Sequence, residues 1–220
     1  MPNDGGSILK TGVLPQLPDA WLDWAIELQS LAQAGLFYGK DRFDIERFER
    51  IREISAEMVA FRADKPVEKV RDLFCNETGY QTPKLDSRAA IFQNDRILLV
   101  QENNGTWSLP GGWVDVGLSV KENVIKEVRE EAGLDVSADL VIAVQDREKH
   151  NLPRYAYRVC KIFVLCTSLG GEFHPNSETI GSDYFPENSL PPLATEKNNE
   201  EQVGMCFNAY RSGQWTTQFD

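Results

Sequence analysis

The sequence predicts an α/β protein in which a mixed β-sheet lies between helices, preceded by a small helical domain. Before about residue 80, apolar residues recur only at helical spacing, and no segment alternates as a strand does. From Ser87 onward, short apolar runs typical of strands stand on both sides of one amphipathic helix, expected at residues 120–132. Strands before and after such a helix are typical of an α/β/α sandwich.

Three segments of the 220-residue chain differ in composition. Residues 1–17 are punctuated by Gly and Pro, and we expect a flexible N-terminus there. Residues 18–78 are expected to form the helical domain, and residues 79–220 the α/β domain. The length is sufficient for one large domain with an appendage of this kind.

The helical domain is predicted to be an antiparallel hairpin of two helices, followed by a short third helix after Pro66. The apolar stripe of the first helix consists of Trp21, Trp24, Leu28, Leu31 and Ala32, and Leu22 and Ile26 widen this face. The stripe of the second consists of Phe48, Ile51, Ile54, Met58 and Phe61. Helices this short cannot bury so many aromatic side chains alone. We expect them to pack on the rest of the chain or on a second copy, and a homodimer through these helices is our hypothesis.

The α/β domain is expected to contain several short strands and a second long helix. The strands are predicted at residues 88–92, 96–101, 140–144, 155–166 and 184–185, and the helix at residues 198–211. Asn94-Asp95 is typical of a tight hairpin turn between the first two strands. The glycines at 111–112 are expected to form a loop before the helix at 120–132. That helix should turn Val124, Ile125, Val128 and Ala132 toward the core.

Charge and cysteine content restrict the partners that the chain can have. A formal net charge of −11 repels nucleic-acid backbones, so a general nucleic-acid binder is disfavoured. No stretch approaches the roughly 18 apolar residues of a membrane span, and the N-terminus lacks the apolar core of a signal peptide. The four cysteines show no metal-binding spacing. Free thiols and a cytoplasmic location are the expectation.

Three glutamates share one arc of the helix at 120–132. Glu127, Glu130 and Glu131 stand at i, i+3 and i+4, where like charges repel one another. The cluster is therefore either a solvated acidic face or a site for a cation. Gly111-Gly112 precedes the helix, and glycine allows a backbone carbonyl to approach an ion closely. Carboxylate and carbonyl oxygens are ligands that suit Mg²⁺ or Mn²⁺.

The stretch that contains these residues resembles the signature box of the Nudix hydrolases. It reads LPGGWVDVGLSVKENVIKEVREEAGL, from Leu109 to Leu134. The family pattern is Gly, five residues, Glu, seven residues, Arg-Glu, apolar, any, Glu-Glu, any, Gly, apolar. The matching positions here are Gly112, Glu127, Val128, Glu130, Glu131, Gly133 and Leu134. The resemblance implies the Nudix α/β/α fold and hydrolysis of a diphosphate linkage.

By the same resemblance, Glu127, Glu130 and Glu131 bind Mg²⁺ or Mn²⁺ together with the carbonyl of Gly111, and Glu131 also takes part in catalysis. Two positions depart from the pattern. Leu118 stands where the first Glu belongs, and Lys126 replaces the Arg. Lys126 keeps a positive charge beside Glu127 and is our third catalytic candidate with Glu131 and Glu178. Glu122, four residues earlier, is expected to pair with it.

Candidates outside the box come from loops and one strand. Glu178 lies in the loop before a late strand, where the family often places an acid, and we expect it to act as general base or extra metal ligand. Glu172 and Asp183 are its competitors. For the substrate we name Arg88, Arg147 and His150. A solvated role is the alternative for each of these side chains.

The N-terminal helices and residues 79–84 resemble one Nudix subgroup, which includes CDP-choline pyrophosphatases and proteins labelled ADP-ribose pyrophosphatases. A small nucleoside diphosphate derivative is therefore the expected substrate. CDP-choline, split to CMP and phosphocholine, is the first choice, and ADP-ribose or an ADP-sugar is the alternative. A non-catalytic nucleotide sensor is a second alternative because of Leu118 and Lys126. An enzyme acting on RNA ends is disfavoured by the net charge.

Overall fold

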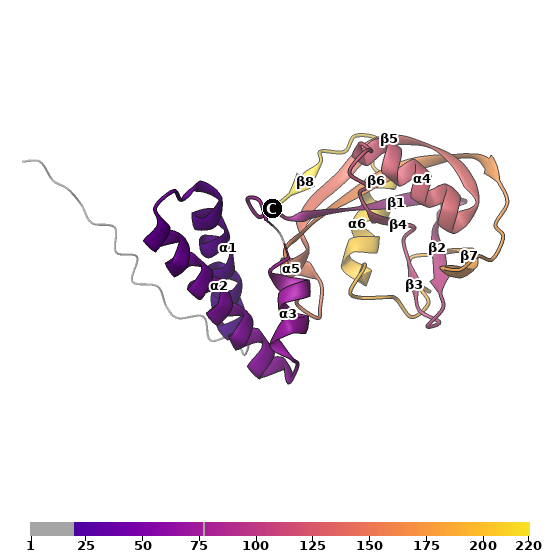
Figure 1. Cartoon of the computed structure of the whole chain (residues 1–220). Coiled ribbons are helices and arrows are strands. Elements are labelled where there is room, and N and C mark those ends of the chain that lie inside the picture. Colours follow the sequence, from indigo (N-terminus) through magenta and orange to yellow (C-terminus); the bar gives the residue numbers. More distant parts are fainter. Residues whose placement is uncertain (1–19, 77) are drawn as a thin grey trace, which may run out of the picture. The chain divides into compact units, whose positions relative to one another are not determined.

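The computed structural model describes residues 20–76 and 78–220, which form two compact units. The units meet between Gln81 and Thr82 (Figure 1). The segment at 1–17, predicted to be flexible, lies outside the described residues, as do Pro18 and Asp19, the first two residues of the expected helical domain. No helix in the described part of the chain has the length and apolar content needed to cross a membrane.

The N-terminal unit contains the predicted helical hairpin and third helix. They are α1 (Ala20–Tyr38), α2 (Arg42–Ala63) and α3 (Val67–Phe74). The turn between α1 and α2 ends at Asp41, whose side chain caps α2 by accepting a 2.9 Å hydrogen bond from the backbone N–H of Phe43. Close packing of the two helices depends on Gly35, because a Cβ there would lie 2.4 Å from the ring of Phe48. The hairpin is thus fixed by one cap and one small residue.

The apolar face predicted for α1 is buried on one side only. Ala32, Leu22 and Ile26 are buried, whereas Trp24 is 48% exposed and Leu31 is 60% exposed. The first helix is therefore apolar over more of its surface than the hairpin uses, and sequence periodicity alone could not tell which side packs. Among the described residues, the side with Trp24 and Leu31 is left largely uncovered.

The C-terminal unit is built on a mixed eight-stranded sheet. Its strands are β1 (Lys84–Gln93), β2 (Arg96–Glu102), β3 (Trp107–Ser108), β4 (Gly111–Trp113), β5 (Leu134–Asp146), β6 (Val159–Gly171), β7 (Thr179–Phe185) and β8 (Gln218–Phe219). Its helices are α4 (Val120–Ala132), α5 (Arg147–His150) and α6 (Glu200–Arg211). Strand β1 runs parallel to β6 but antiparallel to β2 and β4, so the predicted mixed sheet is confirmed.

Alternate residues of β1 and β2 serve two cores on opposite faces of the sheet (Figure 1). Ala89 and Ile91 pack with Val124, Val128 and the rest of the apolar side of α4. The neighbouring Ala90 and Ile97 pack with the buried side chains of α6. Helices on both faces complete the predicted α/β/α sandwich, and α4 occupies the predicted residues.

One predicted strand boundary is wrong. The strand expected at 155–166 begins only at Val159, which pairs with Lys84 at the very start of β1. On its other side, β6 pairs with β5 only from Cys160 onward. The start of β6 is therefore set by where its neighbouring strands begin and end, and Tyr155 and Tyr157 lie in the preceding loop.

The loop expected at residues 111–112 is instead part of strand β4, which pairs with Ser87 and Arg88 of β1. Gly111 has φ of +141°, and a Cβ there would lie 2.0 Å from the carbonyl oxygen of Ser87. This position in the sheet therefore requires glycine.

Replacing Gly111 by Ala should destabilise the C-terminal unit by about 2–4 kcal/mol, because strained backbone and a backbone clash both oppose it. The measurement is the thermal unfolding midpoint. Gly117→Ala is the matched control, since a Cβ at Gly117 meets nothing within 4 Å. Equal midpoints for the two variants would contradict this view of β4.

Candidate active site

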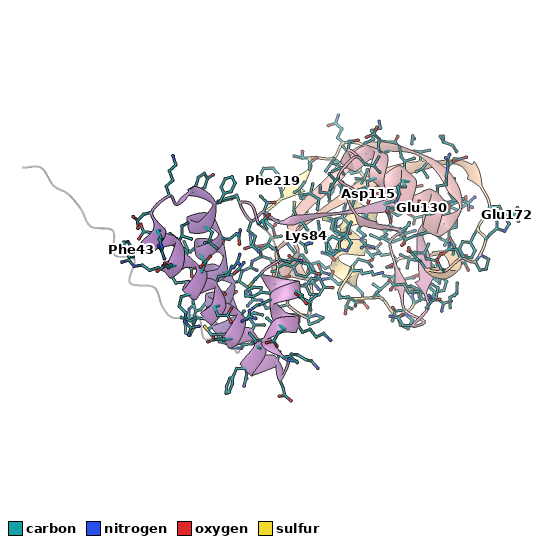
Figure 2. All side chains as sticks on the ribbon, viewed as in Figure 1. Phe43, Lys84, Asp115, Glu130, Glu172 and Phe219 are labelled. Atoms are coloured by element: carbon teal, nitrogen blue, oxygen red, sulfur yellow. The ribbon has the colours of Figure 1, made fainter. Side chains whose placement is uncertain are left out.

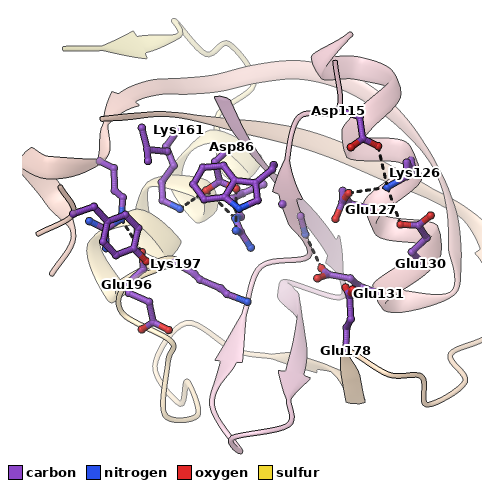
Figure 3. Close-up of a pocket in the computed structure, with 17 residues that line it drawn as sticks. Asp86, Asp115, Lys126, Glu127, Glu130, Glu131, Lys161, Glu178, Glu196 and Lys197 are labelled. Carbon is purple, nitrogen blue, oxygen red and sulfur yellow. Dashed lines mark hydrogen bonds and ion pairs between the residues drawn. The ribbon is translucent and has the colours of Figure 1, made fainter. Parts of the chain in front are cut away.

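A cleft of about 460 Å³ opens in the C-terminal unit between α4 and the ends of β1, β4 and β6 (Figure 3). One wall carries the carboxylates of α4, and the facing wall carries cationic side chains from the sheet. Lys126, Glu127 and Glu130 lie on the first wall, opposite Lys161 and Asp86 on the second. The cleft therefore combines the two kinds of charge that a metal ion and a phosphorylated ligand require.

Local signals at both ends fix α4 and its carboxylates. Ser119 and Glu122 form a reciprocal capping box at its start, and Gly133 ends it with φ of +67°. Glu122 takes part in this cap, because its Oε2 accepts a 2.9 Å hydrogen bond from the backbone N–H of Ser119. The predicted pairing of Glu122 with Lys126 is therefore wrong.

The three glutamates of α4 differ in their surroundings. Glu131 is only 8% exposed, and its Oε2 accepts a 2.7 Å hydrogen bond from the backbone N–H of Gly111. Burial raises the pKa of Glu131 to about 7. Burial also raises the pKa of Glu127, whereas Glu130 is exposed. The ionised carboxylate of Glu131 is therefore poorly solvated, and the group that donates a hydrogen bond to it is the neutral backbone N–H of Gly111.

Lys126 connects the other two glutamates. Its Nζ lies 3.1 Å from Oε1 of Glu127, 2.9 Å from Oε2 of Glu130 and 3.4 Å from Oδ2 of Asp115. Asp115 and Glu130 are also labelled in Figure 2, at the same part of the domain. The hydrogen bonds that Lys126 donates to Glu130 and Glu127 raise its pKa, which keeps the ammonium charged. Lys126 therefore neutralises these carboxylates in the ligand-free chain.

The described residues contain no group of three or more Asp, Glu, His or Cys side chains already gathered around one point for a metal. The donor set nevertheless fits a hard divalent cation. Glu127 and Glu131 are oxygen donors whose charged forms burial disfavours, and a cation would favour them. A Cβ at Gly112 would lie 2.8 Å from Oε2 of Glu127, so glycine keeps space beside that oxygen.

Glu178 lines the same cleft and points toward Glu131 (Figure 3). Its loop is attached to the end of α4 by two side chains. Asn176 donates a 2.8 Å hydrogen bond to the carbonyl oxygen of Glu130, and Thr179 donates a 2.8 Å bond to that of Glu131. The competitor Glu172 does not line the cleft; it lies just beyond α4, where its backbone N–H donates a 3.1 Å hydrogen bond to the carbonyl oxygen of Gly133. Asp183, the other competitor, does not line the cleft.

The cationic wall begins with Arg88 in the middle of β1. Arg88 is 5% exposed, and its Nη2 lies 2.9 Å from Oδ1 of Asp86. On the adjacent strand β6, Lys161 is 1% exposed, with Nζ 2.5 Å from Oδ2 of the same Asp86. One buried carboxylate therefore faces two buried cations. The alternative that Arg88 is a solvated strand edge is wrong.

Arg147 continues this wall from the short helix α5. Its guanidinium lies 3.4 Å from the centroid of the Tyr155 ring, and its Nη1 donates a 2.8 Å hydrogen bond to Glu148. Arg147 is 1% exposed and lines the cleft. His150 does not line it, because its Nε2 lies 2.6 Å from Oδ2 of Asp220.

Sequence reasoning missed Lys161, Asp86 and Lys197 as residues of the cleft. Lys161 carried a signal, since it is a lone charge inside the apolar run of β6. Asp86 lies just before the strand expected at residues 88–92, and Lys197 lies just before the helix expected at residues 198–211. Charged residues at such positions are usually solvated, so neither carried a signal.

The fold and the cleft define an α/β enzyme that handles an anionic, phosphorylated ligand between carboxylates and cations. Residues 83–204 match the family model described as the NUDIX domain, which is more than half of the chain. Residues 19–74 match the model described as a UDP-X-like, N-terminal oligomerisation domain. The chain belongs to the Nudix family and is a Nudix hydrolase, so the resemblance seen in the box is confirmed.

Three relatives indicate where the chain stands in that family. It is 42% identical to YjhB of Bacillus subtilis, provisionally named an ADP-ribose pyrophosphatase, over 91% of this chain and 97% of that protein. It is 61% identical to an ADP-ribose pyrophosphatase from Streptococcus suis of known structure, covering 63% of this chain and all of that one, with a TM-score of 0.60. A UDP-X diphosphatase structure is 29% identical over 90% of this chain and 97% of that one, with a TM-score of 0.60.

Proposed function

We propose that the protein hydrolyses the diphosphate linkage of ADP-ribose, giving AMP and ribose 5-phosphate, with Mg²⁺ or Mn²⁺ as cofactor. The observation that carries the proposal is the cleft itself, in which buried cations face the carboxylates of the Nudix helix. A diphosphate has two anionic groups a few ångströms apart, and such a cleft offers partners for both. The names of the two more similar relatives support ADP-ribose as the substrate.

In this proposal Glu127, Glu130 and Glu131 hold the divalent cation together with the backbone of Gly111. A cation bound there supplies positive charge to the diphosphate and makes water more acidic. Lys126 would give up its ion pairs with Glu127 and Glu130, which would then bind the cation, and would pair with the substrate instead. Glu178 accepts a proton from the attacking water. The water oxygen bonds to one phosphorus, and the bridging oxygen leaves with the other phosphoryl group, so one water is consumed for each linkage broken.

The comparisons favour ADP-ribose over CDP-choline, which the sequence placed first. Both relatives above 40% identity are named for ADP-ribose, and none of the relatives described above is named for CDP-choline. All three glutamates of the box line the cleft together with Glu178, and this set of carboxylates favours a hydrolase over a sensor without activity. Departures at Leu118 and Lys126 therefore leave a site that is suited to catalysis.

A substrate panel tests this function. ADP-ribose, CDP-choline and UDP-glucose are each incubated with Mg²⁺ and with Mn²⁺, and phosphate is measured after a phosphatase acts on the products. ADP-ribose should have the highest kcat/KM. A higher value for CDP-choline would reverse the substrate assignment, and no turnover of any compound would favour the sensor. A Glu131→Gln preparation controls for contaminating hydrolases.

We also propose that the exposed face of α1 joins two copies of the chain, in line with the matched oligomerisation domain. Trp24, Leu31 and Tyr38 are spaced seven residues apart, so they share one face of the helix, and each is at least 48% exposed. Two such faces packed together would remove them from water.

Sedimentation should therefore give about twice the 24.9 kDa mass of one chain. Leu31→Glu should produce the monomer, because it places a charge in the centre of that face. Ser30→Glu adds the same charge at an exposed position next to it and should stay dimeric. A monomeric parent protein, or a dimeric Leu31→Glu variant, would refute the proposal.

A further inference from the structure

The cleft has two chemically different ends on either side of its carboxylates, and its direction of substrate binding can be inferred from them. We propose that the nucleoside monophosphate half of the substrate lies against Lys161, Arg147 and Trp113. The linked group, a hydroxyl-rich sugar phosphate, then lies in a separate polar recess beside Asn104 and Ser177. The inference rests on the proposed function and specifies its substrate orientation.

The first end carries buried cationic groups that a phosphate could reach. Lys161 and Arg88 share the single carboxylate of Asp86. Burial, together with repulsion by Arg88, lowers the pKa of Lys161 to about 8, and an anion bound beside it would favour its charged form. Nη2 of Arg147 is buried without a hydrogen-bond partner among the residues that the structure describes. A buried donor of this kind is normally satisfied, and a phosphoryl oxygen is the acceptor that fits the charge.

The same end carries flat aromatic surfaces. Trp113 and Tyr155 both line the cleft, and the ring of Tyr157 lies 6.2 Å from Trp113 and 5.3 Å from Tyr155 between centroids. Trp113 is 48% exposed, so its ring is accessible to a ligand in the cleft. Aromatic side chains beside a phosphate site suit a nucleobase, because every base can stack on them.

The other end is a recess of about 390 Å³ that shares Glu131, Glu178 and Lys197 with the cleft. Its remaining lining consists of Glu102, Asn103, Asn104 and Ser177, with no aromatic side chain. The recess is held in shape by two contacts. Asn103 donates a 2.8 Å hydrogen bond to the carbonyl oxygen of Ser177, and Lys197 lies 2.7 Å from Glu102.

Amide, hydroxyl and carboxylate groups without an apolar surface are partners for sugar hydroxyls. A quaternary ammonium such as choline is instead recognised by aromatic rings, which this recess lacks. Glu131 and Glu178 border both the cleft and the recess. The diphosphate would therefore lie where the cleft joins the recess, with one half of the substrate in each.

Product binding tests the orientation without turnover. The probes are AMP and ribose 5-phosphate, titrated separately into the full chain by calorimetry with Mg²⁺ present. Trp113→Ala and Lys161→Met should weaken AMP binding by about tenfold or more and leave ribose 5-phosphate within about twofold. Ser177→Tyr, which fills the recess, should do the reverse. Lys149→Met removes an exposed lysine outside the cleft and should change neither affinity.

The orientation is overturned if Ser177→Tyr weakens AMP while Trp113→Ala does not, or if every variant weakens both products equally. Thermal unfolding shows whether Lys161→Met folds, and the half-exposed Trp113 provides a second variant if it does not. Should AMP follow the expected pattern while ADP-ribose is not hydrolysed, the proposed function fails and the orientation stands. Hydrolysis of ADP-ribose with the reverse pattern would refute the orientation alone.

Discussion

Replacing Glu131 by Gln should lower kcat by about 10³-fold or more, which corresponds to roughly 4 kcal/mol of transition-state stabilisation. Glu131 is the most buried of the three glutamates on α4, and it adjoins Gly111, Glu127 and Glu178 in the cleft. The amide keeps the shape and can still accept the hydrogen bond from Gly111, but it carries no charge for a cation. Activity should fall at every Mg²⁺ concentration.

The pKa of Glu131 gives a second measurement that separates lost function from lost folding. Burial raises this pKa from 4.5 to about 7 in the folded chain. A carboxyl with a raised pKa favours the folded state only while it is protonated. That contribution is complete below the ordinary value and is lost as the pH rises through about 7.

In metal-free solution at about pH 8, the Gln variant should therefore unfold at the same temperature as the parent or above it. At about pH 5 the two midpoints should coincide, since Glu131 is then mostly protonated. Glu201→Gln, on the exposed side of α6, is the control for both measurements. A Gln variant with nearly normal turnover at saturating Mg²⁺ would show that the metal assignment is wrong.

The carboxylate side of the cleft could be predicted because its signals are local. Ser119, Glu122 and Gly133 mark the ends of α4 within a few residues of the glutamates, and helical geometry then fixes which side chains share an arc. Gly111 was singled out from the sequence, but the structural reason that glycine is required at this position was not predicted. The glycine is needed because β4 pairs closely with β1, and strand pairing depends on residues far away in the sequence.

The cationic side could not be predicted in the same way. Asp86 and Lys161 are 75 positions apart, and they meet because β1 and β6 are parallel neighbours in a particular register. A shift of one residue would turn Lys161 to the opposite face of the sheet. Arg147 was named from its charged loop, yet its contact with Tyr155 depends on β6 starting later than its alternating pattern indicates. Long-range register, rather than composition, decides this half of the site.

Replacing Glu178 by Gln should lower kcat by roughly 10²–10⁴-fold if this carboxylate is the general base. Its loop is attached to the carbonyl oxygens of Glu130 and Glu131 through Asn176 and Thr179, so the side chain is supported beside α4. KM and the Mg²⁺ dependence should change little, because binding of substrate and cation is left in place. If Glu178 is instead a metal ligand, raising Mg²⁺ should restore part of the lost rate.

A kcat series at increasing Mg²⁺ distinguishes these two roles, and ¹⁸O-labelled water identifies the phosphorus that is attacked. The label should appear in only one of the two products, since a single water enters at a single phosphorus. Glu201→Gln, on the exposed side of α6 and outside the cleft, is again the control. Normal kcat in Glu178→Gln would exclude both roles and return the search to Asp183 and Glu172. Label in neither product would reject hydrolysis itself, whichever carboxylate serves as the base.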